Sequence, residues 1–208
     1  DKAPIIEVSG RTYPVDVRYR PLNPDEAEDH DQLEGIFQAV DELCDEPGLG
    51  DILIFMNGER EIRDTADALA KRAFGNRSMR DTEVVPLYAR LSSAEQNKIF
   101  QSHTGRRIVL ATNVAETSLT IVGVTVVIDG GQARVARFDA NRGINTLLVE
   151  KVSVASADQR AGRAGRTAPG ICVRLWTERE HAQRALQELP EVKRLDLAEV
   201  VLTLKASG

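Results

Sequence analysis

The residues with the clearest chemical potential form the stretch QRAGRAGR (159–166), in which arginines recur every third residue. On a helix this spacing places Arg160, Arg163 and Arg166 along one face, with Gln159 just before them. Like charges on one face repel each other unless an anion neutralises them. Because the planar guanidinium group matches phosphate oxygens, the pattern predicts a site for a di- or triphosphate.

Small residues separate these arginines, and two of them are glycines, Gly162 and Gly165. Glycine in a helix interior costs about 1 kcal/mol relative to alanine. Two glycines within one turn therefore indicate that another surface approaches this segment closely. This argues against the alternative interpretation, a solvated basic helix with surface ion pairs.

The composition is that of an ordinary globular protein, with 208 residues, 42% hydrophobic and 28% charged. This length suits one domain, or one domain with a fragment of another. The two cysteines, Cys44 and Cys172, are far apart, and the three histidines are scattered. The sequence therefore predicts no metal site, no disulfide framework and a reducing, cytoplasmic location. No apolar run approaches the length of a membrane span, so no membrane association is expected.

Charge is unevenly distributed, although the formal net charge is only −5. Residues 24–46 contain many acids and no lysine or arginine, and apolar residues recur at helical spacing from Leu33 to Leu43. We expect an acidic amphipathic helix at the surface, with a functional acidic patch as the alternative.

The remaining sequence alternates short apolar runs with amphipathic segments. The run Ile52–Met56, which lies between polar and glycine residues, is typical of a strand buried on both faces of a parallel sheet. Strands that alternate with helices predict right-handed crossovers and a sheet covered on both faces. We expect further strands at 83–88, 107–111, 125–128 and 171–176, a polar turn at 112–118, and helices at 59–74, 93–101 and across the arginines.

One part interrupts this alternation. Arg134–Phe138 and Ile144–Val152 are rich in residues that favour strands, and residues 139–143 have the composition of a hairpin turn. A hairpin inserted into an open α/β sheet would project from it. The alternative is that it extends the edge of the sheet.

Five segments carry a resemblance to a known family, in the order in which the family has them. They are ILIFMNGEREI (52–62), LYARLSSAEQNKIF (87–100), RRIVLATNVAETSLTI (106–121), VVIDGGQARVARF (126–138) and QRAGRAGR (159–166). Together they resemble the second RecA-like domain of DEAH-box RNA helicases, and they look most like the bacterial HrpA and HrpB type. The resemblance implies an α/β fold: a RecA-like open, mostly parallel sheet with helices on both faces and an inserted β-hairpin.

The resemblance also implies a domain organisation. Residues 1–20 match the stretch that leads in from the preceding RecA-like domain, and residues 21–190 match the second RecA-like domain, with its hairpin at about 133–152. Residues 191–208 match the start of a winged-helix domain. The expected partners are therefore RNA and these two flanking domains of the same chain.

Two motifs of such helicases do not occur in this sequence, the GxxxxGK[ST] phosphate loop and the DEAH sequence. In the family both belong to the first RecA-like domain. We therefore expect this chain to be half of a composite site and to hydrolyse ATP negligibly by itself.

The family binds ATP with Mg²⁺ between its two RecA-like domains, and the first domain is expected to hold the metal. By resemblance, Arg163 and Arg166 are arginine fingers that reach the γ-phosphate, and Gln159 helps to orient the attacking water. Arg160 matches either a nucleotide contact or the partner of a structural carboxylate.

Two further residues match nucleotide contacts. Thr120 matches a ribose contact, but Val122 stands where the family often has an aspartate that also binds the ribose. Sugar recognition is therefore expected to be weaker, or to use the backbone. Phe100 could stack on the base, which would give loose selectivity among nucleoside triphosphates; the alternative is that it belongs to the core.

The resemblance places RNA at the carboxyl ends of the strands, where ligands of open α/β sheets gather. Contacts with phosphates and sugars are independent of base sequence. The hairpin resembles the strand-separating wedge of the family. The residues expected to contact RNA are Asn57, Gly58, Thr112, Asn113, Arg134 and Arg137.

Two other functions remain open from the sequence alone. One is another superfamily 2 motor, such as a DEAD-box or DNA-translocating enzyme, which the ETSLTI segment and the hairpin disfavour. The other is a non-catalytic RecA-like module that only binds partners. The joint presence of Gln159, Arg163 and Arg166 argues against that second alternative.

Overall fold

A computed structural model describes residues 12–22, 28–44, 46, 48–73, 81–117, 119–139 and 142–190, together with 193, 202 and 205. The strands are β1 (Val15–Tyr19), β2 (Asp51–Phe55), β3 (Glu83–Leu87), β4 (Arg107–Ala111), β5 (Val124–Asp129), β6 (Gln132–Asp139), β7 (Ile144–Lys151) and β8 (Gly170–Arg174). The helices are α1 (Glu28–Cys44), α2 (Glu59–Ala73), α3 (Ser93–Asn97), the 3₁₀ helix η2 (Lys98–Phe100), α4 (Val114–Thr117), α5 (Val154–Ala161) and α6 (Glu178–Ala182). Within these ranges, no helix combines the length and the apolar character needed to cross a membrane.

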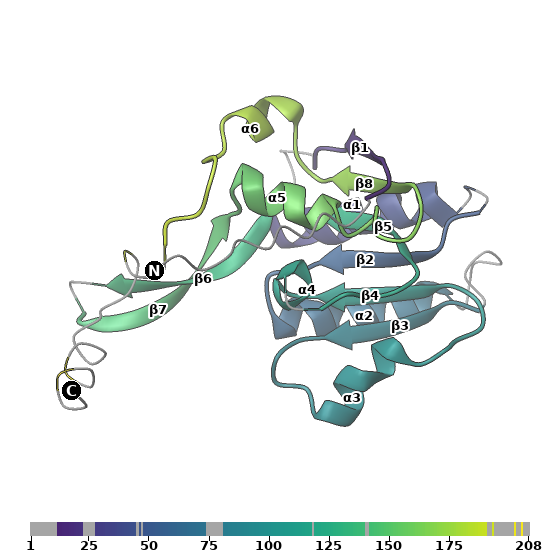
Figure 1. Ribbon diagram of the computed structural model, residues 1–208, viewed down its shortest axis with the longest axis horizontal. Coiled ribbons are helices and arrows are strands. Elements are labelled where there is room, and N and C mark those ends of the chain that lie inside the picture. Colours follow the sequence, from purple (N-terminus) through teal and green to yellow (C-terminus); the bar gives the residue numbers. More distant parts are fainter. Residues whose placement is uncertain are drawn as a thin grey trace, which may run out of the picture.

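The main sheet has the strand order β1-β8-β5-β2-β4-β3, and all neighbouring strands in it are parallel (Figure 1). The interior strands β2 and β4 are buried along their whole length. A strand can bury both of its sides only where both faces of the sheet are covered. The predicted α/β fold with a mostly parallel sheet is confirmed.

The edge strand β1 comes from the segment that the sequence assigns to the lead-in from a preceding domain. It runs parallel to β8, with Tyr19 opposite Arg174. The segment therefore joins the sheet from Val15 onward, while residues 1–11 lie outside the described part of the chain. Residues 191–208, the expected start of a winged-helix domain, also lie outside it apart from 193, 202 and 205.

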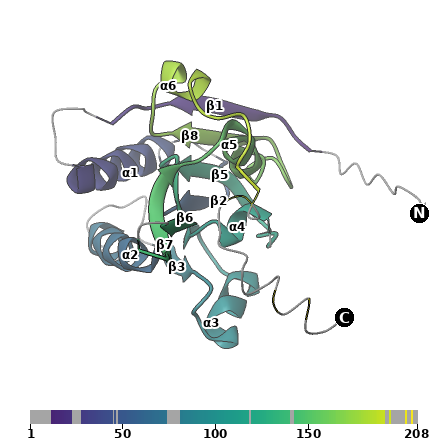
Figure 2. The ribbon, with the colours of Figure 1, turned by 90° about the vertical axis from the view of Figure 1, so that its left-hand side faces the viewer.

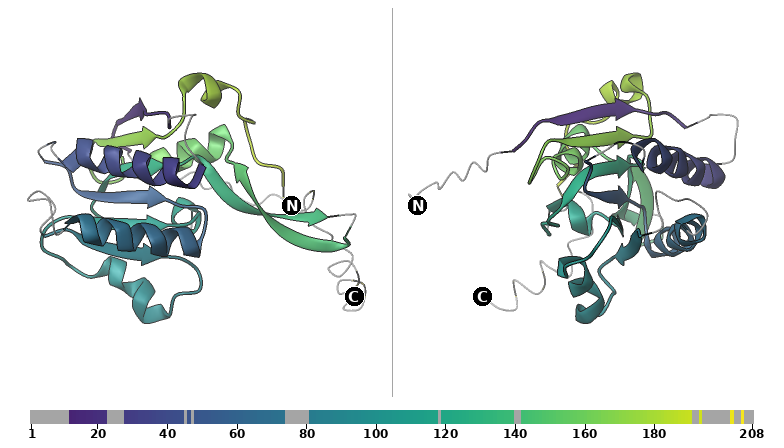
Figure 3. Two further views of the ribbon diagram at one scale, coloured as in Figure 1. Left: turned by 180° about the vertical axis from the view of Figure 1, so that it is seen from behind. Right: turned by 90° about the vertical axis from the view of Figure 1, so that its right-hand side faces the viewer.

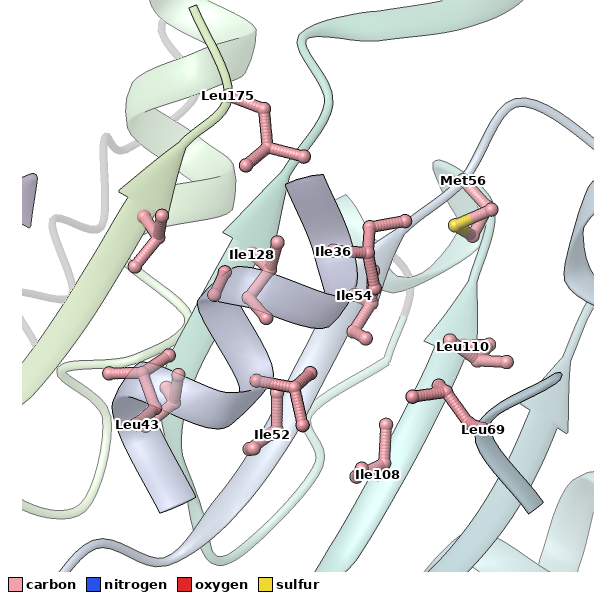
Figure 4. Close-up of a cluster of buried hydrophobic side chains, with 14 of the residues drawn as sticks. Ile36, Leu43, Ile52, Ile54, Met56, Leu69, Ile108, Leu110, Ile128 and Leu175 are labelled. Carbon is pink, nitrogen blue, oxygen red and sulfur yellow. The ribbon is translucent and has the colours of Figure 1, made fainter. Parts of the chain in front are cut away.

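Helices α1 and α2 lie side by side on one face of the sheet, as the view from behind shows (Figure 3). Ile36 and Leu43 of α1 pack with Ile52 and Ile54 of β2 in one buried cluster (Figure 4). The predicted acidic surface helix is thus present as α1. Part of its acidic side is neutralised within the domain, because Arg20 Nη2 lies 2.8 Å from Glu42 Oε1.

The opposite face of the sheet is covered by η2, α4 and α5. These elements contribute Ile99, Ala115 and Ala161 to a second buried cluster, together with Leu53 and Val109 from the sheet. The segments that carry the predicted nucleotide contacts are therefore anchored on this face.

The hairpin forms a two-stranded sheet of its own and projects from the main sheet (Figure 1, Figure 2). Strands β6 and β7 pair antiparallel, from Gln132 opposite Lys151 to Asp139 opposite Ile144. The prediction of a projecting hairpin is confirmed, and the alternative, an extension of the sheet edge, is wrong.

Two features fix the root of the hairpin. Gly131 has a φ of +73°, and a Cβ atom there would lie 2.7 Å from the Trp176 ring, so the turn from β5 into β6 requires glycine. The buried Arg184 donates through Nη1 to the carbonyl oxygens of Gly131 (2.7 Å) and Val152 (3.0 Å). Its Cζ lies 4.1 Å from the centroid of the Trp176 ring. One arginine therefore binds both ends of the hairpin.

We expect Arg184→Ala to lower the free energy of unfolding by about 1–3 kcal/mol, because two buried carbonyl oxygens each lose a hydrogen bond from the guanidinium. Hydrogen exchange in β6 and β7 should become faster. Urea unfolding and exchange measurements test both effects. The exposed Arg179 in α6 provides a control, since Arg179→Ala should change the stability by less than about 0.5 kcal/mol. Equal losses in the two variants with unchanged exchange would contradict this role of Arg184.

Candidate functional site

The arginine segment begins as helix α5 but does not remain helical. Ser153 caps the amino end of α5, and the helix ends at Ala161. The next residues form tight turns, in which the amide of Arg163 donates to the carbonyl oxygen of Arg160. The predicted single stripe of three arginines is therefore wrong. Because the backbone leaves the helix after Ala161, Arg160 is buried whereas Arg166 is exposed.

Arg160 is fully buried and is bound by groups from several elements. Its Nη1 donates to Asp129 Oδ1 at the end of β5 (2.8 Å), and its Nε donates to Glu116 Oε2 in α4 (3.0 Å). Nη1 also donates to the carbonyl oxygen of Gln132 at the start of β6 (3.2 Å). The guanidinium lies over the Phe55 ring of β2, with Cζ 4.7 Å from the ring centroid. One side chain thus connects α5 with four other elements.

The charge of Arg160 is neutralised within its own domain. Burial lowers the pKa of the guanidinium, but the attraction of Asp129 and Glu116 outweighs this effect, and the net pKa is raised. Of the two interpretations that the sequence leaves open for Arg160, the geometry favours the partner of structural carboxylates over the nucleotide contact.

Arg163 and Arg166 line one pocket together with Thr120. The guanidinium of Arg163 donates to the carbonyl oxygen of Glu116 in α4. It also donates to the carbonyl oxygen of Leu119, which follows α4 (2.8 Å). Arg166 is exposed and forms no ion pair with any residue in the described part of the chain. Three residues predicted to meet the nucleotide are thus brought together.

The two guanidinium groups of this pocket affect each other. Burial lowers the pKa of Arg163, the positive charge of Arg166 lowers it further, and the attraction of Glu116 offsets only part of this decrease. An anion bound between the two guanidinium groups would relieve their repulsion. This pair of guanidinium groups therefore has the electrostatic character of a phosphate site, whereas most of the residues that line the pocket are apolar.

The predicted close approach is present at one of the two glycines. A Cβ atom on Gly165 would lie 2.5 Å from the carbonyl oxygen of Tyr13, whose amide donates to the Gly165 carbonyl oxygen (2.8 Å). At Gly162 an added Cβ atom would find its nearest neighbours at 3.4 Å, which is ordinary contact. The turn that carries Arg163 and Arg166 is therefore held against the segment that leads into β1.

Gln159 and Phe100 are exposed, and neither lines that pocket. Gln159 lies in α5, next to the buried Arg160. Phe100 ends η2 with 55% of its surface exposed, whereas its neighbour Ile99 packs into the second cluster. This exposure disfavours a core role for Phe100, and its contact with a base stays a prediction.

The polar residues predicted to contact RNA lie at neighbouring strand ends. Asn57 and Gly58 follow β2, Thr112 and Asn113 follow β4, and these two strands pair in parallel. Both pairs of residues therefore share the carboxyl edge of the sheet. Asn57 Nδ2 also donates to Gln132 Oε1 (3.1 Å), which connects this edge with the hairpin. RNA binding by these residues stays a prediction.

The two hairpin arginines predicted to contact RNA are engaged with acids. Arg134 Nη2 lies 3.1 Å from Glu61 Oε1 of α2. Arg137 donates through Nε (2.7 Å) and Nη2 (2.6 Å) to Glu150 on the opposite strand, and these hydrogen bonds raise the pKa of Arg137. An RNA phosphate that binds either arginine would have to share or displace its carboxylate partner.

Two residues of the site escape prediction from the sequence, Glu116 and Asp129. They lie in the motifs ATNVAETSLTI and VVIDGGQARVARF, close to the ends of β4 and β5. A buried arginine requires carboxylates nearby. Acidic residues close to the ends of predicted strands are therefore the sequence feature from which these two partners of Arg160 could have been predicted. The predicted polar turn at 112–118 is also wrong in part, because it contains the short helix α4.

Comparison with known proteins agrees with this fold. Residues 35–168, more than half of the chain, match the family described as helicase conserved C-terminal domain. The chain therefore belongs to the family of helicase C-terminal domains.

The whole chain is similar to the ATP-dependent RNA helicase HrpA of Escherichia coli (strain K12), with 58% identity over 210 residues. It is 55% identical over 208 residues to the HrpA homolog of Haemophilus influenzae. Each alignment covers 100% of this chain but only 16% and 15% of the two relatives, so the chain spans about one sixth of their length. Among solved structures it is similar to the Escherichia coli DEAH/RHA helicase HrpB, with a TM-score of 0.87 and 37% identity over 100% of this chain and 25% of that one. The predicted resemblance is confirmed.

We expect Arg160→Met to lower the free energy of unfolding by about 3–5 kcal/mol, because removal of one partner leaves the buried Asp129 uncompensated. Denaturant unfolding measures the loss. Arg166→Met is the control, since Arg166 is exposed and its replacement should change the stability by less than about 0.5 kcal/mol. If the two variants were equally stable, the buried ion pairs would not be what holds α5 in place.

Proposed function

We propose that this chain is the C-terminal RecA-like half of an ATP-dependent RNA helicase. It supplies side chains to an ATP site that a preceding RecA-like domain completes. The observation that carries the proposal is the pair of mutually repelling guanidinium groups of Arg163 and Arg166, which meet Thr120 at one small pocket. The similarity of the whole chain to proteins named ATP-dependent RNA helicases supports it.

In the proposed site, ATP lies between the two domains with its γ-phosphate at this pocket. Phosphoryl transfer requires positioning and neutralisation of charge on the γ-phosphate oxygens. Arg166 is exposed and free to extend across the cleft, and Arg163 stands beside it, fixed by carbonyl oxygens that follow β4. We assign both as arginine fingers. Gln159, exposed in α5, would orient the attacking water.

The remaining nucleotide contacts are proposed to be few and unselective. Thr120 would contact the ribose, and Phe100 would stack on the base. Stacking does not involve the hydrogen-bonding groups that distinguish one base from another, so several nucleoside triphosphates should be accepted. Val122, which is 71% exposed, offers the sugar no hydrogen bond from its side chain. Arg160 would act from inside the domain by fixing α5, and not by touching the nucleotide.

The Mg²⁺ ion that accompanies ATP is assigned to the preceding domain. Among the residues that the structure describes, no group of three or more His, Cys, Asp or Glu side chains is arranged to hold a metal. When bound, the ion neutralises charge on the β- and γ-phosphates. This division of the site leads us to expect negligible ATP hydrolysis by the isolated chain.

RNA is proposed to lie along the carboxyl edge of the sheet, on Asn57, Gly58, Thr112 and Asn113. Contacts with phosphates and sugars at this edge would be independent of base sequence, as translocation requires. The hairpin would stand where a duplex meets this track, and its arginines would exchange carboxylate partners for phosphates.

We expect Arg166→Ala in the full-length protein to lower kcat of RNA-stimulated ATP hydrolysis by about 10³–10⁵-fold, the range typical of an arginine finger. Because Arg166 is exposed, the variant should unfold at the same temperature as the wild type. ATPase assays with single-stranded RNA and thermal unfolding measure the two quantities. Arg72→Ala, in the last turn of α2, is the control and should keep the wild-type kcat.

Unchanged RNA-stimulated hydrolysis in Arg166→Ala would contradict the proposal and favour a module that only binds partners. Stimulation of the wild-type protein by DNA but not by RNA would instead favour another superfamily 2 motor.

A further inference from the structure

We propose that Glu116 is a positioning residue that connects the RNA-facing edge of the sheet with the arginine fingers. The inference rests on the proposed function, because it assigns communication between RNA and the ATP pocket to one side chain. Glu116 would act through Arg160 and Arg163, without touching ATP.

The carboxylate of Glu116 joins α4 to α5. Its Oε2 accepts hydrogen bonds from Ser156 Oγ (2.8 Å) and from Arg160 Nε (3.0 Å). The side chain is only 14% exposed, so little water competes for these bonds. A charged hydrogen bond in such surroundings holds the two helices together more firmly than a neutral one.

The backbone of Glu116 forms a direct hydrogen bond with Arg163, one of the two proposed arginine fingers. Its carbonyl oxygen accepts a hydrogen bond from the Arg163 guanidinium, which also donates to the carbonyl oxygen of Leu119 (2.8 Å). A shift of α4 therefore moves an acceptor of Arg163, the carbonyl oxygen of Glu116.

At its amino end, α4 directly follows Thr112 and Asn113, which are proposed to contact RNA. The amide of Glu116 donates to the carbonyl oxygen of Asn113 (3.0 Å), and the amide of Ala115 donates to that of Thr112 (3.1 Å). The helix is only four residues long, so it has no further turns that could absorb a displacement. RNA held at Thr112 and Asn113 would position Glu116, and Glu116 would position Arg163.

The test is Glu116→Gln in the full-length protein. Glutamine keeps the shape of the side chain but loses its charge, while Arg160 keeps Asp129 as a partner (2.8 Å). We expect kcat of ATP hydrolysis at saturating RNA to fall about 10- to 100-fold, as for a small misplacement of a catalytic group. The KM for ATP and the RNA concentration for half-maximal stimulation should change less than about twofold, since ground-state binding is retained.

Two further variants separate positioning from a general loss of stability. Glu83 Oε2 also pairs with a buried arginine, Arg107 Nη2 at 2.8 Å, at the amino end of β3 and β4. Glu83→Gln should therefore lower the unfolding temperature but keep kcat when measured where all variants are folded. Ser156→Ala removes one donor to Glu116 without changing any charge, and it should lower kcat by a smaller factor than Glu116→Gln.

An unchanged kcat in both Glu116→Gln and Ser156→Ala would overturn the inference. An equal fall in kcat for Glu83→Gln and Glu116→Gln would also overturn it. Failure of the proposed function is a different result, because the wild-type protein itself would then show no RNA-stimulated hydrolysis.

Discussion

The buried guanidinium group of Arg160 is the interaction on which the rest of the site depends. A permanently charged group is tolerated inside a protein only where carboxylates and other acceptors surround it. Asp129, Glu116 and the carbonyl oxygen of Gln132 supply them here, and the guanidinium Cζ lies over the Phe55 ring. Each group comes from a different element. Because all must be satisfied together, β5, β6, α4 and α5 take fixed positions around one side chain.

The burial of Arg160 explains why the arginines of one short segment differ in exposure and in hydrogen-bond partners. With Arg160 held inside, the helix ends one residue later and the chain turns. The turn brings Arg163 against the carbonyl oxygens that follow β4 and leaves Arg166 at the surface. The same buried group contacts the first residue of the hairpin, Gln132, so it also fixes where the hairpin leaves the sheet. The proposed ATP pocket and the proposed RNA edge therefore share one internal support.

Most of the sheet could be predicted from the sequence because its strands are continuous apolar runs with clear ends. β4 has the predicted bounds, Arg107–Ala111, and β2 is shifted by one residue from the predicted 52–56. The arginine segment could not be predicted in the same way. A three-residue spacing describes a stripe only while the backbone stays helical, and the burial of Arg160 is a tertiary effect. The carbonyl oxygens that bind Arg163 belong to the backbone, which every residue type has. The sequence therefore gives no indication of which residues bind Arg163.

The most direct test of this account is a structure of the full-length protein with single-stranded RNA, Mg²⁺, ADP and aluminium fluoride, which mimics the transferred phosphoryl group. We expect the Arg166 guanidinium to lie within hydrogen-bond distance of the fluoride, with Arg163 beside it and Arg160 still bound to Glu116 and Asp129. A structure in which Arg160 turns to the phosphate mimic, or in which Arg166 faces away from the cleft, would contradict it.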